Sequence, residues 1–351
     1  MKALQIIVFL VVSLFSLNAI KAQGAYKDQF AHTFSIVARD SITGEMAVGV
    51  QSHWFSVGTI VAWGKSGVGV VATQSFVNPA YGPEGLALMQ EGKSARQALE
   101  MLTAKDEGKN FRQLGFLDHK GNVASFTGKN CVASAEHFEG NNFAVQANMM
   151  LNDNVVPAMV KAYIDNADLP LAERVVKTML VAQEAGGDIR GKQSAALIVV
   201  NGSPVENIWE DKKVDLRVDD SPEPLQELER LLKVHRAYEH MNRGDLAVEA
   251  NDMTTALEEY GAAQKMFPDN LEMKYWTAIA LANGGKVNEA LPIFKDVFSS
   301  DGNWKTLTKR LPESGLLTVS EGDLKKIMER NALAENASVD AGQLLRSAIL
   351  V

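Results

Sequence analysis

The sequence predicts an α+β domain followed by an all-α domain. Across residues 33–218, short apolar segments with the two-residue period of β-strands are interspersed with longer stretches that have the period of helices. Beyond the motif "DDSPEPL" the composition shifts to Ala, Leu, Glu and Lys, and the pattern becomes helical. A chain of 351 residues favours two domains, and a hydrophobic content of 46% provides material for a core in each.

Residues 1–22 have the pattern of a secretory signal peptide, in which a basic start precedes an apolar run and small residues follow it. We expect cleavage after Ala22, which makes residues 23–32 a short leader ahead of Thr33. An uncleaved anchor helix is the alternative. However, the apolar run is short for a membrane span, and no cysteine follows it for lipid attachment. The sequence therefore predicts an exported protein, periplasmic or extracellular, without a stable membrane anchor.

Charge and cysteine content exclude several classes of function. The net charge is −8 and no basic stripe is present, which argues against a nucleic-acid partner. Cys131 is the only cysteine, so neither an internal disulfide nor a cysteine-based zinc cluster can form. Cys131 follows "GKN" after a predicted strand, a position open to a thiol nucleophile, but free cysteines usually behave as small buried hydrophobes, and we favour that interpretation. The histidines lack ligand-like spacing, and we predict neither a metal nor a cofactor.

The order of elements in residues 33–218 is strands, two helices, strands, two helices and a final strand. The strand signals are, in order, "TFSIVARD", "EMAVGVQS", "GVGVVATQS", "FRQLGFLD", "NVASFTG", "NFAVQANMM" and "SAALIVV". The expected helices cover residues 82–90, 95–104, 155–165 and 171–185. This order favours sheets covered by helices over a regular alternation of strands and helices with one parallel sheet.

Residues 219–224 are predicted to be a linker, because two aspartates and two prolines there disfavour both a helix interior and a central strand. In the following helical domain, residues 225–351, "ALEEYGAAQKMFPDN" and "ALPIFKDVFSSDGN" begin 34 residues apart, at Ala256 and Ala290. This is the period of tetratricopeptide repeats, which are helix-turn-helix units. An unrelated helical bundle remains the alternative. Such repeats would suit the docking of a protein partner on these helices.

Polar side chains gather at the ends of the predicted strands. They are neutral amides and hydroxyls together with one arginine, and such groups suit hydrogen bonds to a carbonyl, an oxyanion or an amide better than metal binding. The candidate binding residues are Gln51, His53, Gln74, Asn78, Asn148, Arg190 and Gln193. Turn formation or helix capping is the structural alternative for each of them. We predict that Gln51, His53, Gln74, Asn148 and Gln193 converge on one pocket near Thr33.

Several long motifs resemble one family of unknown function, DUF1028. They are "HTFSIVARD", "GEMAVGVQSHWFSVG", "GVGVVATQSFVNPAYGPEGL", "TGKNC", "VQANMM" and "AGGDIRGKQSAALIVV". The resemblance extends from Thr33 to Val200 and groups the chain with the N-terminal-nucleophile (Ntn) hydrolases. It implies a four-layer αββα sandwich, which agrees with the order of elements. It supplies no established substrate.

The same resemblance implies a role for Thr33. In Ntn hydrolases the first residue of the mature chain is the nucleophile, and its own α-amine acts as the base. Here a second cut, between His32 and Thr33, would be needed to free that amine. The sequence departs from the threonine proteases of this group. At the end of the second strand, where they carry an acid, it reads Gln51-Ser52-His53, and its only nearby lysine, Lys65, falls in a predicted turn.

Two classes of function stay open. The first is an exported amidohydrolase that acts on small amide or peptide-like compounds, with Thr33 as the catalytic residue. The second is a non-catalytic αββα binding module whose helical repeats recruit a protein partner. A free α-amine at Thr33 distinguishes them, because only the enzyme requires it.

Overall fold

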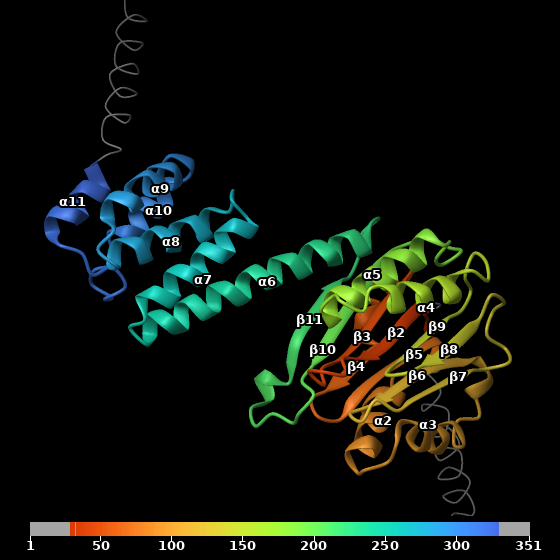
Figure 1. The fold of residues 1–351 in the computed structure, drawn as a ribbon. Helices are drawn as coiled ribbons and strands as arrows, with labels where there is room; N and C mark the ends of the chain where they lie inside the picture. The colour runs from red at the N-terminus through yellow and green to blue at the C-terminus, as the bar shows by residue number, and fades with distance from the viewer. Residues whose placement is uncertain (1–28, 32, 330–351) are drawn as a thin grey trace, which may run out of the picture. The chain divides into compact units, whose positions relative to one another are not determined.

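The computed structural model describes residues 29–31 and 33–329 (Figure 1). The predicted signal peptide and most of the predicted leader lie outside this part of the chain, as do residues 330–351. The expectation of an α+β domain followed by a helical region is confirmed. The chain divides into two compact units, the first ending at Leu232 and the second beginning at Lys233. Each unit is described by itself below.

The first unit contains two antiparallel sheets. One sheet has the strand order β1-β5-β6-β7, with β4 also paired to β5; the strands are β1 (Gln29–Ala31), β4 (Ala62–Lys65), β5 (Gly69–Val77), β6 (Arg112–Asp118) and β7 (Val123–Thr127). The other has the order β11-β10-β3-β2-β9-β8, with β2 (Thr33–Arg39), β3 (Met46–Ser52), β8 (Glu136–Gly140), β9 (Phe143–Ala147), β10 (Ser194–Val200) and β11 (Lys212–Val218). We call them the β5 sheet and the β2 sheet.

A pair of helices covers the outer face of each sheet (Figure 1). The helices are α2 (Tyr81–Gln90) and α3 (Ala95–Thr103) on the β5 sheet, and α4 (Val155–Asp165) and α5 (Leu171–Glu184) on the β2 sheet. Short 3-10 turns lie at Val57–Thr59, Lys109–Phe111 and Ile208–Glu210. The inner faces of the two sheets pack against each other, so central strands such as β3, β6 and β10 are buried on both sides, whereas β8 and β11 are partly exposed.

The alternation of β2 shows how the sequence builds these layers. Phe34 and Ile36 belong to the core beneath α4 and α5, whereas Val37 belongs to the core between the sheets. Because successive side chains of a strand point to opposite faces, Thr33 and Ser35 share the inner face with Val37. The inner face of β2 is therefore polar at Thr33 and Ser35, where the strand begins, and apolar at Val37.

The predicted linker is tied to the first unit. The backbone N–H of Ser56 donates to Asp219 O at 2.9 Å, and that of Ser221 donates to Gln193 O at 2.8 Å. Helix α6 (Pro224–Glu249) then begins directly, and its first turns place Leu225 and Leu228 in the core beneath α4 and α5. The compact unit therefore extends past the predicted linker to Leu232.

The second unit consists of the rest of α6 and further helices. These are α7 (Met253–Met266), α8 (Leu271–Asn283), α9 (Val287–Ser300), α10 (Gly302–Thr308) and α11 (Glu321–Glu329). Tyr275 lies at the centre of the α8–α10 core, where it is fully buried and its hydroxyl shares a 2.9 Å hydrogen bond with that of Thr308. Among the described residues, no helix is both long and apolar enough to cross a bilayer.

The 34-residue offset seen in the sequence has a structural counterpart. Ala256 of α7 and Ala290 of α9 are both fully buried. Asn251 and Gly285, also 34 residues apart, both have positive φ, at 58° and 76°. Such left-handed residues end helices. The turn after α6 and the turn after α8 therefore share a left-handed residue at the same offset.

We predict that Gly49→Ala destabilises the first unit, because β3 and α5 approach each other closely there. An added Cβ would lie 2.5 Å from Val175 Cγ1 and 3.0 Å from Met179 Cε. Overpacking of this kind costs about 1–3 kcal/mol, which thermal or denaturant unfolding of the first unit measures.

Gly261→Ala is the matched control, since it adds the same methyl group to α7 with no atom within 4 Å. It should leave the second unit unchanged or stabilise it by up to about 1 kcal/mol. An unchanged unfolding midpoint for Gly49→Ala would contradict the packing described here.

Candidate functional site

Four strands of the β2 sheet begin or end at the same end of the sheet, and Thr33 lies there. Thr33 pairs with Ser52, the last residue of β3, and Ser52 pairs in turn with Ser194, the first residue of β10. On the other side, Phe34 pairs with Ala147, the last residue of β9. Turn residues that follow or precede these strands are therefore brought together at this end of the sheet, although they are distant in sequence.

The carbonyl oxygen of Thr33 accepts three hydrogen bonds. The side-chain amide of Gln74 donates from the opposing sheet at 3.1 Å. Asn148 donates twice, from its backbone N–H at 3.1 Å and from Nδ2 at 3.3 Å. All three residues are fully buried. A carbonyl with three donors is held firmly in position, so the backbone of Thr33 is fixed relative to both sheets.

Gln113 of β6 joins the two amides that hold Thr33. Its Oε1 accepts from Gln74 Nε2 at 2.7 Å and from Asn148 Nδ2 at 2.9 Å. Its Nε2 donates to Ala147 O and to the hydroxyl of Thr127, both at 2.9 Å. Gln113 thus links the β5 sheet to β9 of the other sheet through side-chain bonds that are closed to water.

A second branch of the cluster reaches deeper between the sheets. The hydroxyl of Ser35 donates to Gln74 Oε1 at 2.6 Å and accepts from Gln146 Nε2 at 2.7 Å. The amide of Gln146 lies directly over Gly115, where a Cβ would come within 2.5 Å of its Oε1. Only glycine at position 115 leaves room for this amide. We call Ser35, Gln74, Gln113, Gln146 and Asn148 the amide cluster.

Backbone strain flanks the amide cluster. Ser75, directly after Gln74, has φ of 71°, and Met149, directly after Asn148, has φ of 57°. Side-chain-bearing residues rarely adopt this left-handed conformation, and such outliers concentrate at functional sites. Both residues that hold the Thr33 carbonyl therefore precede a strained position.

The amide cluster beside Thr33 is electrically neutral. Every member of the amide cluster is uncharged, and its outermost contact is His137, whose Nδ1 lies 2.8 Å from the Thr127 hydroxyl. Burial lowers the pKa of His137, although Glu139 and Glu136 oppose this shift. The imidazole is therefore neutral near pH 7. The arrangement can position an amide or carbonyl group, and the amide cluster itself carries no fixed charge.

Comparison with known proteins identifies the family of this first unit. Residues 33–228, more than half of the chain, match the model described as "Family of unknown function (DUF1028)". The chain belongs to the DUF1028 family. It is similar to the crystal structure of protein SPO2555 from Silicibacter pomeroyi, described as family-model DUF1028, with 29% sequence identity and a TM-score of 0.52. The similarity covers 58% of this chain and 88% of that one. Among curated proteins there is no match.

Two of the predicted binding residues of the DUF1028 unit, Gln74 and Asn148, meet at Thr33 as expected. Gln51 does not, because it shares the outer face of the β2 sheet with its register partners Phe34 and Ala195, which belong to the core beneath α4 and α5. Gln51 is fully buried there, and neither atom of its amide has a hydrogen-bond partner among the described residues. The prediction of one shared pocket is wrong for this residue.

Gln193 and His53 lie at the same end of the β2 sheet as Thr33, but they do not join the amide cluster. The Nε2 of Gln193 donates to Asp220 Oδ1 at 3.2 Å, and this bond lies near the surface. His53 is exposed, and its backbone N–H donates to Asp188 Oδ2 at 3.2 Å. Both residues therefore lie outside the amide cluster, and the prediction of convergence is wrong for them too.

The remaining predicted residues have structural contacts. Arg190 forms an ion pair with the buried carboxylate of Asp188, with an Nη2–Oδ2 distance of 2.6 Å. Asn78 accepts the backbone N–H of Ala80 at 3.2 Å and so orders the turn before α2. Asn78 also lines a polar hollow of about 440 Å³ beside Asp106.

The predicted binding residues did not include three members of the cluster, Ser35, Gln113 and Gln146. All three are polar residues next to apolar stretches of their strands, and that contrast was the signal available. Cys131 is half-buried; burial raises the pKa of its thiol, although contacts with Ser75 and Gly128 oppose this, and Sγ lies 3.4 Å from Arg112 O.

Within residues 29–31 and 33–329, no three His, Cys, Asp or Glu side chains gather in a way that could hold a metal ion.

We predict that Gln74→Leu lowers the free energy of unfolding of the DUF1028 unit by about 1–3 kcal/mol, because it leaves buried partners such as Ser35 without their bonds. Gln193→Leu removes the same amide from the surface bond to Asp220 and should change stability by less than about 0.5 kcal/mol. Denaturant unfolding measures both variants. Equal losses would show that the amide cluster is no more important than a surface contact.

The Asp106–Arg112 ion pair, with an Nε–Oδ2 distance of 3.0 Å, predicts a pH dependence. Burial raises the pKa of Asp106, but the hydrogen bond and the charge of Arg112 outweigh this and lower it overall. A carboxyl with a depressed folded-state pKa stabilises the fold above its unfolded pKa, about 4, and loses that contribution as the pH falls further. The stability gap between wild type and Asp106→Asn should therefore be largest at neutral pH and narrow below about pH 4.

Denaturant titrations at several pH values measure this gap. Glu107→Gln, at the exposed neighbouring position, is the control and should produce no such pH-dependent gap. A gap for Asp106→Asn that stays constant down to acidic pH would contradict the assignment.

Proposed function

We propose that the DUF1028 unit is an N-terminal-nucleophile amide hydrolase in which Thr33 is the nucleophile. The observation that carries the proposal is the Thr33 carbonyl, held by Gln74 and Asn148 at the first residue of β2. Such restraint exceeds what a residue that merely opens a strand requires. Two packed sheets with helix pairs outside them also agree with an Ntn-type αββα sandwich, as the sequence resemblance implies.

The chemistry requires a free α-amine at Thr33. An α-amine has a pKa near 8 and can accept the hydroxyl proton while Oγ attacks the substrate's carbonyl carbon. The amine then returns the proton to the leaving nitrogen, the C–N bond breaks, and an acyl ester on Oγ remains. Water, deprotonated by the same amine, hydrolyses that ester. While His32 is attached, the nitrogen is an amide and cannot act as a base.

Strand β1 indicates the class of substrate. Its backbone pairs antiparallel with β5, with Ala31 opposite Ser75 and Gln29 opposite Val77. This segment directly precedes the bond that must be cut, so it occupies the position of the acyl part of a peptide-like substrate. Once it leaves, the edge of β5 beside Thr33 can pair with another extended chain. Peptide-like amides therefore fit this edge better than compact ones.

The helical unit is proposed to be a tetratricopeptide-like docking region. The paired turns at Asn251 and Gly285 and the equivalent burial of Ala256 and Ala290 support this assignment. Two such repeats expose helix faces on which a protein partner can bind. The signal-peptide pattern of residues 1–22 supports export to the periplasm or the medium. Cleavage after Ala22 would then precede the cut between His32 and Thr33.

The alternative is a non-catalytic binding module, and two observations favour it. Thr33 is fully buried in the uncut chain, and the amide cluster around it is neutral. The lysine that the sequence offered as a tuning group, Lys65, donates instead to Gln90 Oε1 at 2.9 Å, at the opposite end of β5. In this alternative the amide cluster serves only to join the sheets.

Hydrolysis of a panel of aminoacyl and peptidyl aminomethylcoumarins by the exported protein tests the proposal. Thr33→Ala should reduce the rate to the uncatalysed background, because no other activated hydroxyl replaces it, and Thr33→Ser should keep a measurable fraction. Thr59→Ala, an exposed threonine on the same unit, is the control and should match wild type. A Thr33→Ala variant as active as wild type would exclude Thr33 as the nucleophile. Absence of hydrolysis across the panel would favour the binding module.

A further inference from the structure

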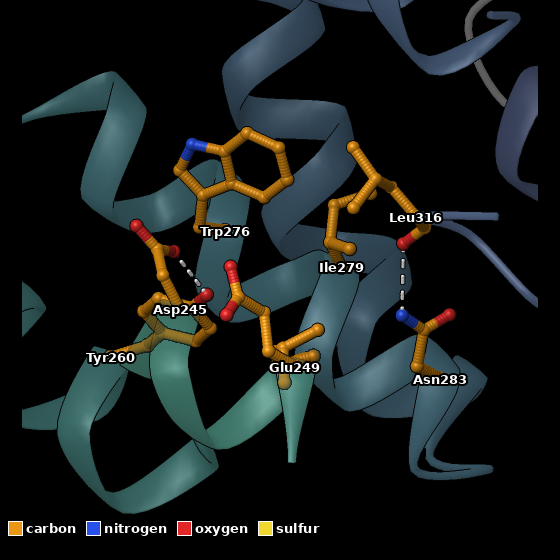
Figure 2. A pocket seen from close by; sticks show the side chains of 9 residues that line it. Asp245, Glu249, Tyr260, Trp276, Ile279, Asn283 and Leu316 are labelled. Carbon is orange, nitrogen blue, oxygen red and sulfur yellow. Dashed lines mark hydrogen bonds between the residues drawn. The ribbon is translucent and has the colours of Figure 1, made fainter. Parts of the chain in front are cut away.

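The helical unit contains a hollow of about 310 Å³ between α6, α7 and α8 (Figure 2). Its lining residues are Asp245, Val248, Glu249, Tyr260, Trp276, Ile279, Ala280, Asn283 and Leu316. All of them belong to the second compact unit. The hollow is mostly apolar, and its charged lining residues are both acidic.

The wall formed by Leu316 is held in place by hydrogen bonds from α8. Asn283 Nδ2 donates to Leu316 O at 3.0 Å, as Figure 2 shows, and Asn283 Oδ1 accepts the backbone N–H of Thr318 at 2.8 Å. The side chain of Leu316 nevertheless stays 42% exposed, although it lies beside other apolar residues. The hollow is therefore a fixed feature that presents apolar surface to the solvent.

The two acidic residues lie on the same face of α6, one turn apart. Carboxylates at positions i and i+4 of a helix repel each other. Asp245 accepts the hydroxyl of Tyr260 at 2.6 Å, whereas Glu249 has no hydrogen bond or ion pair with any described residue. In Figure 2 the Glu249 carboxylate lies below Trp276, and the Asp245 carboxylate lies to one side, bonded to Tyr260. A bound cation would relieve this repulsion.

The helical repeat itself does not require these acids. With the 34-residue offset, Asp245 corresponds to Ile279 and Glu249 corresponds to Asn283, both of which also line the hollow. The same positions on α8 are thus filled by an apolar and an amide side chain. The acidic pair is specific to α6. Both acids are exposed, and Asp245 holds Tyr260, so only the Glu249 carboxylate is left to meet a ligand of the hollow.

We propose that this hollow binds an arginine side chain from an extended segment of a partner protein. The half-buried ring of Trp276 offers a face on which a guanidinium can stack, and the carboxylate of Glu249 can accept two of its N–H groups. The apolar walls suit the methylene stem. The inference rests on the docking function proposed for the helical unit and names the chemistry of its partner. It is independent of Thr33.

Two pools of acetylated, amidated heptapeptides with neutral flanking residues test the proposal on the full-length protein. The pools differ only at the centre, which is arginine in one and citrulline, its neutral isostere, in the other. The readout is the indole N–H signal of Trp276 in NMR spectra, assigned with Trp276→Phe. The arginine pool should shift this signal saturably, with an apparent affinity about tenfold or more above that of the citrulline pool.

Glu249→Gln should weaken the binding of the arginine pool about tenfold while the citrulline pool is unaffected. The control is Glu258→Gln, which removes the same charge from an exposed position of α7 outside the hollow and should leave binding unchanged. Equal affinities for the two pools, or equal effects of the two variants, would overturn the arginine assignment while leaving docking possible. Failure of both pools to shift the Trp276 signal would exclude the hollow as a docking site.

Discussion

The hydrogen bonds that hold the Thr33 carbonyl between the two sheets are the constraint on which this end of the DUF1028 unit depends. Gln74 donates to it from one sheet and Asn148 from the other, and Gln113 links these two amides. Each amide is buried, so a missing partner would cost about 1–3 kcal/mol. The amide cluster therefore makes the packing of the sheets specific: a shift of either sheet breaks several bonds together.

Other features of the unit follow from this constraint. Gly115 lacks a side chain because the Gln146 amide occupies that space, and Ser75 takes a left-handed conformation directly after Gln74. The inner core changes from valine-rich to amide-rich as it approaches Thr33. If this end of the sandwich served only to hold the sheets together, apolar residues could fill it without the energetic cost of burying polar groups. The proposal that Thr33 performs chemistry gives this polar filling a purpose, because it fixes the nucleophile's backbone.

Much of the fold could be predicted from the sequence, because the strands and helices have clear apolar periods. The extent of the first unit could not be predicted from the sequence. The prolines before α6 suggested a linker, but which core Leu225 and Leu228 enter depends on contacts that are distant in sequence. The 34-residue repeat was visible because Ala256 and Ala290 occupy equivalent positions in α7 and α9.

The candidate site was only partly predictable. Gln74 and Asn148 stood out as amides at strand ends, whereas Gln113, the second residue of β6, was not selected. Gln51 was misplaced because neighbouring residues of a strand point to opposite faces: Ser52 faces the inner side with Thr33, and Gln51 faces the helices. Which face a strand-end residue takes follows from the register of the sheet, and the sequence alone does not supply that register.

The N-terminal residue of the mature protein tests the central claim most directly. Protein purified from the exported fraction, analysed by N-terminal sequencing and intact mass, should begin at Thr33 if the restrained threonine becomes a nucleophile. A protein that hydrolyses amides while still carrying residues 23–32 would contradict the account, because its Thr33 nitrogen would remain an amide.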